Sequence, residues 1–123
     1  MDKIVKKLNQ AFRNYNNEKY DEAISNLEDV IAIGNDESKA YAYNNIGLIQ
    51  YKQGDFSKSI DSYKSSIGYM DNYETPFNLG LSYLKIHNLA DAKSCFEKSI
   101  EINQNYRKAY YKLAEVDEKL KKV

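Results

Sequence analysis

Two glycines occupy matching places in two stretches that otherwise have the pattern of amphipathic helices. Gly47 lies within NNIGLIQYKQGDF (44–56), and Gly80 lies 33 residues later within FNLGLSYLKIHNL (77–89). Glycine in a helix interior costs about 1 kcal/mol relative to alanine, so a packing requirement is expected at both positions. The shared context of the two glycines predicts that the chain repeats itself.

The repeat becomes visible when Gly47 is superposed on Gly80. Small residues then fall on small ones and large on large, as in Ile46 on Leu79, Phe56 on Leu89, Ser59 on Ala92, Tyr63 on Phe96, Ser66 on Ser99 and Ile67 on Ile100. A shift of 36 residues towards the N-terminus adds Ala11, Tyr20, Ala23, Leu27 and Ile31 to the same columns. The C-terminal stretch YRKAYYKLAEVDEKL contributes Leu113 and Ala114. Self-similarity at about 34 residues indicates a repeat architecture.

Turn signals divide the chain into about seven helices and leave no long alternating run that would suggest a strand. These signals are NNEKYD, GNDES, QGD, MDNYETP, KIHN and NQN. We expect Gly54 to end one helix in a left-handed conformation and Asp55 to cap the next. Thr75 before Pro76 is likewise predicted to be an N-cap followed by the first helical residue. The expected fold class is therefore all-α.

The spacing and the residues of AYAYNNIGLIQYKQGDFSKSIDSYKSSI (40–67) resemble the tetratricopeptide repeat. The resemblance implies a single domain over 1–123, a right-handed α-solenoid of antiparallel helix pairs. Its repeats would span about 4–37, 40–72 and 73–106, with a capping helix at about 107–122. The first repeat departs from the pattern at Gln10 and Val30, and the third has His87 in place of a glycine. A fragment of a longer array is the alternative to a capped end.

In such helix pairs the small residues are expected where two helices cross. Removing side chains there lets the axes approach closer than the usual 8–10 Å. Ala11, Gly47, Gly80 and Ala114 would face Ala23, Ser59 and Ala92, while Tyr20, Leu27, Phe56, Tyr63, Leu89 and Phe96 would fill the space between units.

Composition excludes several classes of function. Eighteen basic residues balance eighteen acidic ones, and all but two of the basic residues are lysine, which does not favour a nucleic-acid partner. No apolar run suits a signal peptide or a membrane span, so a cytoplasmic protein with no membrane partner is expected. Cys95 and His87 are the only residues of their kinds, which leaves no disulfide and no zinc site of such ligands. Phosphate-binding glycine loops are also missing, and we expect neither a cofactor nor enzymatic activity.

In the family that the chain resembles, the first helices of the units line a concave wall that binds peptides. Here that wall would carry an asparagine in each unit, a large apolar residue three positions later, and lysines along one edge. The candidate peptide-binding residues are Asn9, Phe12, Asn45, Leu48, Lys52, Asn78, Leu81, Lys85 and Lys112. An asparagine amide both donates and accepts, so a column of asparagines could hold a peptide backbone at about every third residue. The arrangement resembles the asparagine ladder of the O-linked N-acetylglucosamine transferase superhelix.

One known form of this groove, the carboxylate clamp of heat-shock co-chaperones, fits poorly. Leu8 and Phe12 stand where the clamp has a lysine and an asparagine. The lysine edge still admits an acidic side chain in a ligand. The sequence therefore predicts a monomeric, non-enzymatic adaptor that holds an extended segment of a partner protein. A secretion-type chaperone for an unfolded client and a self-assembling scaffold are the alternatives.

Overall fold

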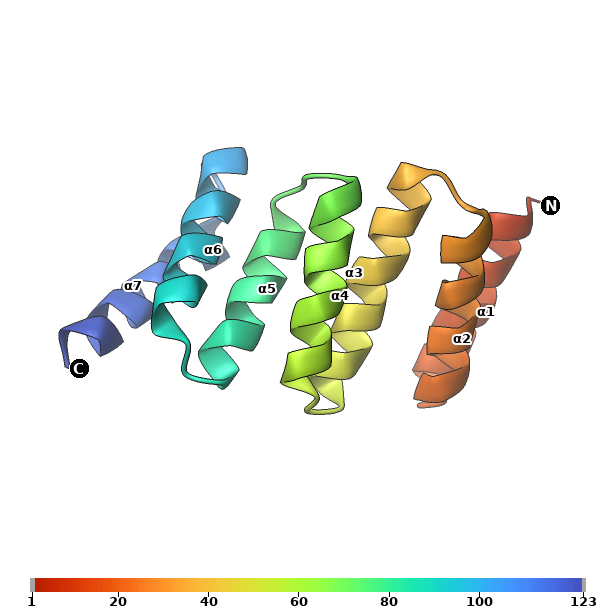
Figure 1. The fold of residues 1–123 in the computed structure, drawn as a ribbon, viewed down its shortest axis with the longest axis horizontal. Coiled ribbons are helices and arrows are strands. Elements are labelled where there is room, and N and C mark those ends of the chain that lie inside the picture. The colour runs from red at the N-terminus through yellow and green to blue at the C-terminus, as the bar shows by residue number, and fades with distance from the viewer. Residues whose placement is uncertain (1, 123) are drawn as a thin grey trace.

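The computed structural model describes residues 2–122 and contains seven α-helices in that range. They are α1 (Lys3–Asn16), α2 (Tyr20–Ile33), α3 (Asp36–Lys52), α4 (Phe56–Tyr69), α5 (Glu74–Lys85), α6 (Leu89–Ile102) and α7 (Arg107–Lys121). They follow one another in chain order along the long axis, with the two ends of the chain at opposite ends of the molecule (Figure 1). The predicted all-α solenoid of about seven helices is confirmed.

Short polar side chains define where several helices begin. The carboxylate of Asp2 accepts hydrogen bonds from the amides of Ile4 and Val5, and Asp55 accepts one from Lys58 at 3.2 Å. Asn35 and Asn88 cap α3 and α6 in the same way. Each such bond satisfies an amide that has no partner within the helix. The prediction that Asp55 caps a helix is confirmed.

The predicted start of α5 is wrong. The helix begins at Glu74, and Thr75 and Pro76 both lie within its first turn. Asn72 supplies the expected capping bond, because its side-chain oxygen accepts from the amide of Thr75 at 2.8 Å and from its hydroxyl at 3.1 Å. An asparagine upstream thus replaces the threonine as the capping side chain.

The same turn conformation joins the two helices of each pair. Gly54 has a φ of 82°, as predicted, and Glu18 and His87 have φ values of 60° and 61° in the corresponding turns. Glycine adopts this left-handed region without a steric cost, whereas other residues pay about 1–2 kcal/mol. Two of the three turns are therefore made by residues that are strained in this conformation.

Replacing His87 with glycine is expected to raise the free energy of unfolding by about 0.5–1 kcal/mol, because relief of strain exceeds glycine's extra entropy in the unfolded chain. Denaturant unfolding monitored by circular dichroism measures the change. Ser94→Gly, in the interior of α6, is the control and should destabilise the protein. A lower unfolding midpoint for His87→Gly would contradict the prediction.

Close packing explains Gly47 and Gly80, although the partner differs from the one predicted. A Cβ atom on Gly47 would lie 2.5 Å from Cε1 of Tyr63, and one on Gly80 would lie 2.6 Å from Cε1 of Phe96. An aromatic ring from the second helix therefore lies on the glycine of its own pair, instead of filling only the space between units. Ser59, expected opposite Gly47, forms a hydrogen bond of 2.8 Å with Ser82 in the next pair.

A serine near the end of the second helix fastens each of the last two helix pairs. The hydroxyl of Ser66 donates to the carbonyl of Ala40, and that of Ser99 donates to the carbonyl of Tyr73, both at 2.7 Å. The matching residue in the first pair is Val30, which is fully buried. The departure at Val30 noted in the sequence thus replaces a buried hydrogen bond with apolar contact.

The buried core forms two clusters. One is made by α1, α2 and α3, including Leu27 and Ile46, and the other by α4 to α7, including Tyr63, Phe96 and Val116. None of the helices between residues 2 and 122 has the length and apolar character needed to traverse a lipid bilayer.

Candidate functional site

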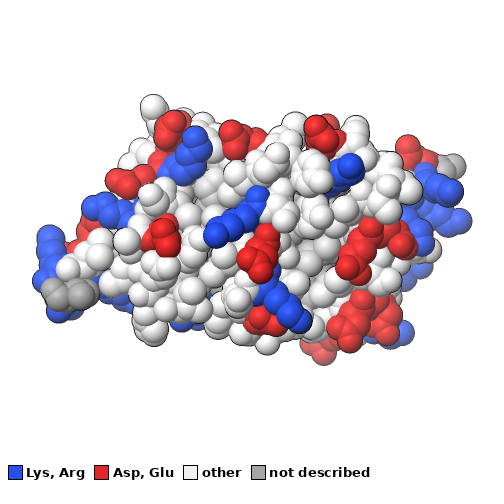
Figure 2. Space-filling model, viewed as in Figure 1, with Lys and Arg blue, Asp and Glu red and all other residues white. Residues whose placement is uncertain are grey.

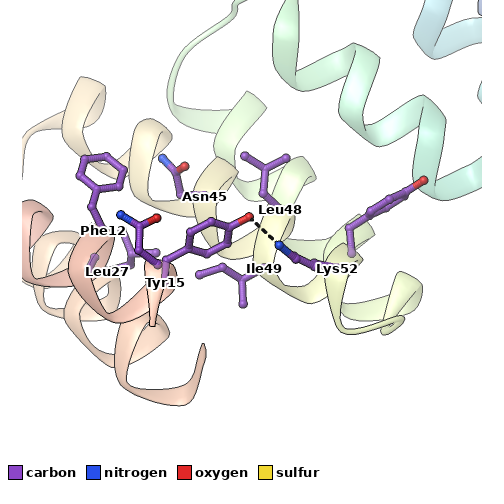
Figure 3. Close-up of a pocket in the computed structure, with 10 residues that line it drawn as sticks. Phe12, Tyr15, Leu27, Asn45, Leu48, Ile49 and Lys52 are labelled. Atoms are coloured by element: carbon purple, nitrogen blue, oxygen red, sulfur yellow. Dashed lines mark hydrogen bonds between the residues drawn. The ribbon is translucent and has the colours of Figure 1, made fainter. Parts of the chain in front are cut away.

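A cavity of about 540 Å³ opens between α1 and α3, on the side where these two first helices face each other. Figure 3 shows side chains from both helices pointing into it. Its lining consists of Ala11, Phe12, Tyr15, Asn16, Leu27, Asn45, Leu48, Ile49, Tyr51 and Lys52. Four of the nine predicted site residues therefore meet in one place: Phe12, Asn45, Leu48 and Lys52.

The cavity has an apolar floor and two exposed apolar walls. Ala11, Leu27 and Ile49 are buried beneath it, and Phe12 and Leu48 flank it with 43% and 39% of their surfaces exposed. Large apolar side chains that remain this exposed on either side of a concavity favour the burial of an apolar group from a ligand.

Lys52, the last residue of α3, places a positive charge at the edge of the cavity. Its ammonium donates to the hydroxyl of Tyr15 at 3.4 Å and lies 5.1 Å from the centre of that ring (Figure 3). The hydrogen bond to Tyr15, followed by the electrostatic influence of Tyr15 and Tyr20, raises the pKa of Lys52 above its ordinary value. The group is therefore charged at neutral pH and held across the mouth of the cavity.

Asn45 contributes an amide to the cavity wall. Its Nδ2 donates to the carbonyl of Tyr41, one turn earlier in the same helix, at 2.8 Å. Within the described part of the chain no other hydrogen bond engages this amide, so its oxygen and second N–H remain available to a ligand.

The other two asparagines of the predicted column are placed differently. Asn78 is half-buried and donates to the side-chain oxygen of Asn44 at 3.2 Å, which joins α5 to α3. Asn9 is exposed and does not line the cavity between α1 and α3. In α1 the position that corresponds to Asn44 is Leu8, whose side chain has no oxygen. Asn45 therefore has no bond equivalent to the one between Asn78 and Asn44. An evenly spaced ladder requires equivalent asparagines, and these three are consequently not equivalent.

The remaining predicted residues lie outside the cavity. Leu81 is half-buried against the core cluster of α4 to α7. Lys85 is exposed as the last residue of α5, and Lys112 forms an ion pair with Glu115 at 3.3 Å. Asn16 also lines the cavity but was not among the predicted site residues, although it lies one turn after Phe12 and thus on the same face.

A second, smaller cavity of about 210 Å³ lies between α3 and α5 near their N-terminal ends. It is lined by Glu37, Ala40, Tyr41, Asn44, Met70, Asn72, Glu74 and Thr75. The two carboxylates in this lining were also missed from the sequence, where acidic residues in first turns have a sufficient explanation as helix-stabilising charges.

Neither the surface in Figure 2 nor the lone thiol suggests other chemistry. Acidic and basic side chains are interspersed on this face, and acidic ones gather over α2, which contains no lysine or arginine (Figure 2).

Burial, with a smaller contribution from Asp91, raises the pKa of Cys95 to about 12, so its thiol is protonated and unreactive at neutral pH. Among residues 2–122 no group of three or more His, Cys, Asp and Glu side chains could hold a metal ion.

Comparisons with known proteins agree with this architecture. The sequence model of the tetratricopeptide repeat matches residues 40–69 and 74–106, together about half of the chain. No curated protein matches the sequence.

Solved structures share the fold at low sequence identity. The first tetratricopeptide domain of Spaghetti (RPAP3), bound to the HSP90 peptide SRMEEVD, has a TM-score of 0.86 at 17% identity, covering 96% of this chain and 93% of that one. The type III secretion chaperone SycD of Yersinia enterocolitica, in complex with a peptide of the translocator YopD, has a TM-score of 0.86 at 21% identity, covering 100% and 97%. The Sgt2 domain of Aspergillus fumigatus has a TM-score of 0.86 at 16% identity, covering 98% and 81%. With the family model matched over half of its length, the chain belongs to the tetratricopeptide repeat family.

Proposed function

We propose that the protein is a monomeric, non-enzymatic adaptor that holds an extended segment of a partner protein against α1, α3 and α5. The observation that carries this proposal is the cavity between α1 and α3, where an apolar floor meets the amide of Asn45 and the ammonium of Lys52. First helices about 10 Å apart match about three residues of extended chain, so the segment would be about six to nine residues long.

The structural neighbours support peptide binding as the general mode. The first tetratricopeptide domain of RPAP3 and the SycD chain are similar to this chain over nearly their whole length, and each was solved with a peptide bound. The peptides bound in those two structures are ligands of RPAP3 and of SycD. In this chain Leu8 and Phe12 replace two clamp positions, so the proposed ligand is anchored by an apolar side chain in place of a terminal carboxylate.

Removing the polar and apolar contacts together is expected to weaken partner binding about tenfold or more, as for the loss of a central interface contact. The variant carries Asn45→Ala and Leu48→Ala. Partners are first captured from lysate of the source cell on wild-type and variant protein and compared by mass spectrometry. The affinity of the captured segment is then measured by calorimetry.

A control variant removes an aliphatic residue and an asparagine elsewhere. Ile33→Ala with Asn105→Ala also deletes an exposed branched aliphatic side chain and an exposed amide, at sites away from the cavity. Binding should be unchanged in this control. Equal affinities of wild type and the Asn45→Ala, Leu48→Ala variant, with both folded, would remove the cavity from the proposal.

A chaperone for an unfolded client is a second candidate, favoured by the similarity to SycD over 100% of this chain. The two candidates differ in the length of client they cover. Limited proteolysis of a captured complex would leave a short protected peptide for an adaptor and a long protected stretch for a chaperone.

Self-assembly is a third candidate, favoured by the free face of α7. Tyr111 is 74% exposed there, and Ala114, which occupies the column of Gly47 and Gly80, is exposed because no described helix packs on it. Light scattering that shows only monomer over a wide concentration range would exclude this candidate.

A further inference from the structure

Carboxylates and ammonium groups occupy opposite ends of α3 and α5, two of the three first helices that would contact the ligand. Glu37 lies in the first turn of α3 and Glu74 in that of α5, where both line the smaller cavity. Lys52 and Lys85 are the last residues of the same two helices. We call Glu37 and Glu74 the acidic edge, and Lys52 and Lys85 the basic edge.

All four charges are available to a partner. Each of these residues is exposed, and none forms an ion pair within 4.0 Å with another residue between 2 and 122. Several other lysines are already paired, as Lys93 is with Asp117 at 3.0 Å and Lys7 with Asp29 at 2.9 Å. The two edges therefore offer unneutralised charge of opposite sign.

The distance between the two edges suits a ligand chain that crosses the first helices midway between them. With a rise of 1.5 Å per residue, a backbone lying over Asn45 is about 12 Å from the level of Glu37 and about 10 Å from that of Lys52. Long side chains reaching from the ligand towards those of the protein can bridge these distances.

Asn45 also determines which way the ligand's side chains point. An amide in the wall that bonds the N–H and C=O groups of an extended segment holds the segment by its edge. Side chains of an extended chain alternate between two opposite directions, so one alternate set would point to the acidic edge and the other to the basic edge. The cavity between α1 and α3 lies on the basic side, because Lys52 and Asn16 belong to its lining.

We infer that the ligand is an extended segment with an alternating pattern, in which one set of positions is basic and the other combines a bulky apolar residue with acidic ones. The basic set meets Glu37 and Glu74. The apolar residue enters the cavity between Phe12 and Leu48, and acidic residues of the same set meet Lys52 and Lys85. The alternation holds for either direction of the ligand chain. This inference rests on the proposed function, because it assigns the ligand's chemistry to the same surface.

A pair of synthetic peptides tests the pattern directly. The probe is fluorescein-labelled Lys-Phe-Lys-Glu-Lys-Leu-Lys-Glu, and the control exchanges the charges to give Glu-Phe-Glu-Lys-Glu-Leu-Glu-Lys. Fluorescence anisotropy at low ionic strength should show the probe binding about tenfold more tightly than the control, and added salt should reduce the difference.

Charge exchange in the protein provides the reciprocal test. The variant with Glu37→Lys, Glu74→Lys, Lys52→Glu and Lys85→Glu is expected to prefer the charge-exchanged peptide. Because these changes oppose the helix dipoles, Lys52→Gln with Lys85→Gln serves as a milder variant and should reduce the preference for the probe. Circular dichroism establishes that each variant is folded.

The outcomes separate this inference from the proposed function. Equal binding of the two peptides, or of neither, would overturn the alternating pattern. The proposed function is decided independently, by whether captured partners depend on Asn45 and Leu48. Preference for the probe that is reversed in the four-residue variant would establish both edges and which set of the ligand's side chains faces each of them.

Discussion

Replacing Phe96 with alanine is expected to lower the free energy of unfolding by about 3–5 kcal/mol, the range for deleting a buried aromatic side chain. Phe96 is fully buried in the cluster of α4 to α7, with its ring centre 5.6 Å from that of Phe77. The ring also lies on the backbone of Gly80, so its loss removes one of the contacts that join α6 to α5. Denaturant unfolding followed by far-ultraviolet circular dichroism gives the change.

Phe12 provides the matched comparison, because it is the same residue type on the wall of the cavity. With 43% of its surface exposed, Phe12→Ala should cost less than about 1 kcal/mol of stability, as surface substitutions do. A similar loss of stability in the two variants would show that burial does not account for the role of Phe96.

The second large effect is expected from adding one methyl group at Gly47. Alanine normally favours a helix by about 1 kcal/mol over glycine, but here its Cβ would lie within 3.0 Å of three ring atoms of Tyr63. Overpacking of this kind costs about 1–3 kcal/mol or more, and we expect Gly47→Ala to destabilise the protein by about 2 kcal/mol. Gly68→Ala is the control, because nothing lies within 4 Å of its added Cβ, and it should be neutral or stabilising.

A double-mutant cycle assigns the effect to the ring. In a Tyr63→Leu background the added methyl group has room, so Gly47→Ala should cost much less than it does in the wild type. Equal costs in both backgrounds would show that the ring of Tyr63 does not determine the need for glycine at this position.

The glycines and turn residues were sufficient to predict the division into about seven helices, and the family resemblance implied their pairing. Gly47 and Gly80 indicated close packing, and Gly54 indicated a left-handed turn. The sequence did not reveal that the close partner is an aromatic ring of the same helix pair. That outcome depends on the rotamer of Tyr63 and on Ser59 turning to Ser82, which are decided by packing in three dimensions.

Some residues of the candidate site could be predicted from the sequence, but which of the nine lie together could not. Phe12, Asn45 and Leu48 could be selected because they fall in the repeat columns that line the concave wall in the family that the chain resembles. Column spacing could not show that Asn78 bonds to Asn44, since that bond depends on the neighbouring column holding a second amide. Nor could it show that the larger cavity lies between α1 and α3, or that Leu81 packs against the core of the later helices and does not line that cavity.

The division of the core into two clusters has a thermodynamic consequence for a ligand. Every residue that lines the larger cavity belongs to α1, α2 or α3, the helices that build the first cluster. A repeat array can open locally at one end while the rest stays folded, and such an opening would dismantle the cavity. A ligand bound there must therefore shift the local unfolding equilibrium of the N-terminal helices far more than that of α6 and α7. Ligand binding in the cavity and the local stability of α1 to α3 are thus thermodynamically coupled, so that a change in one changes the other.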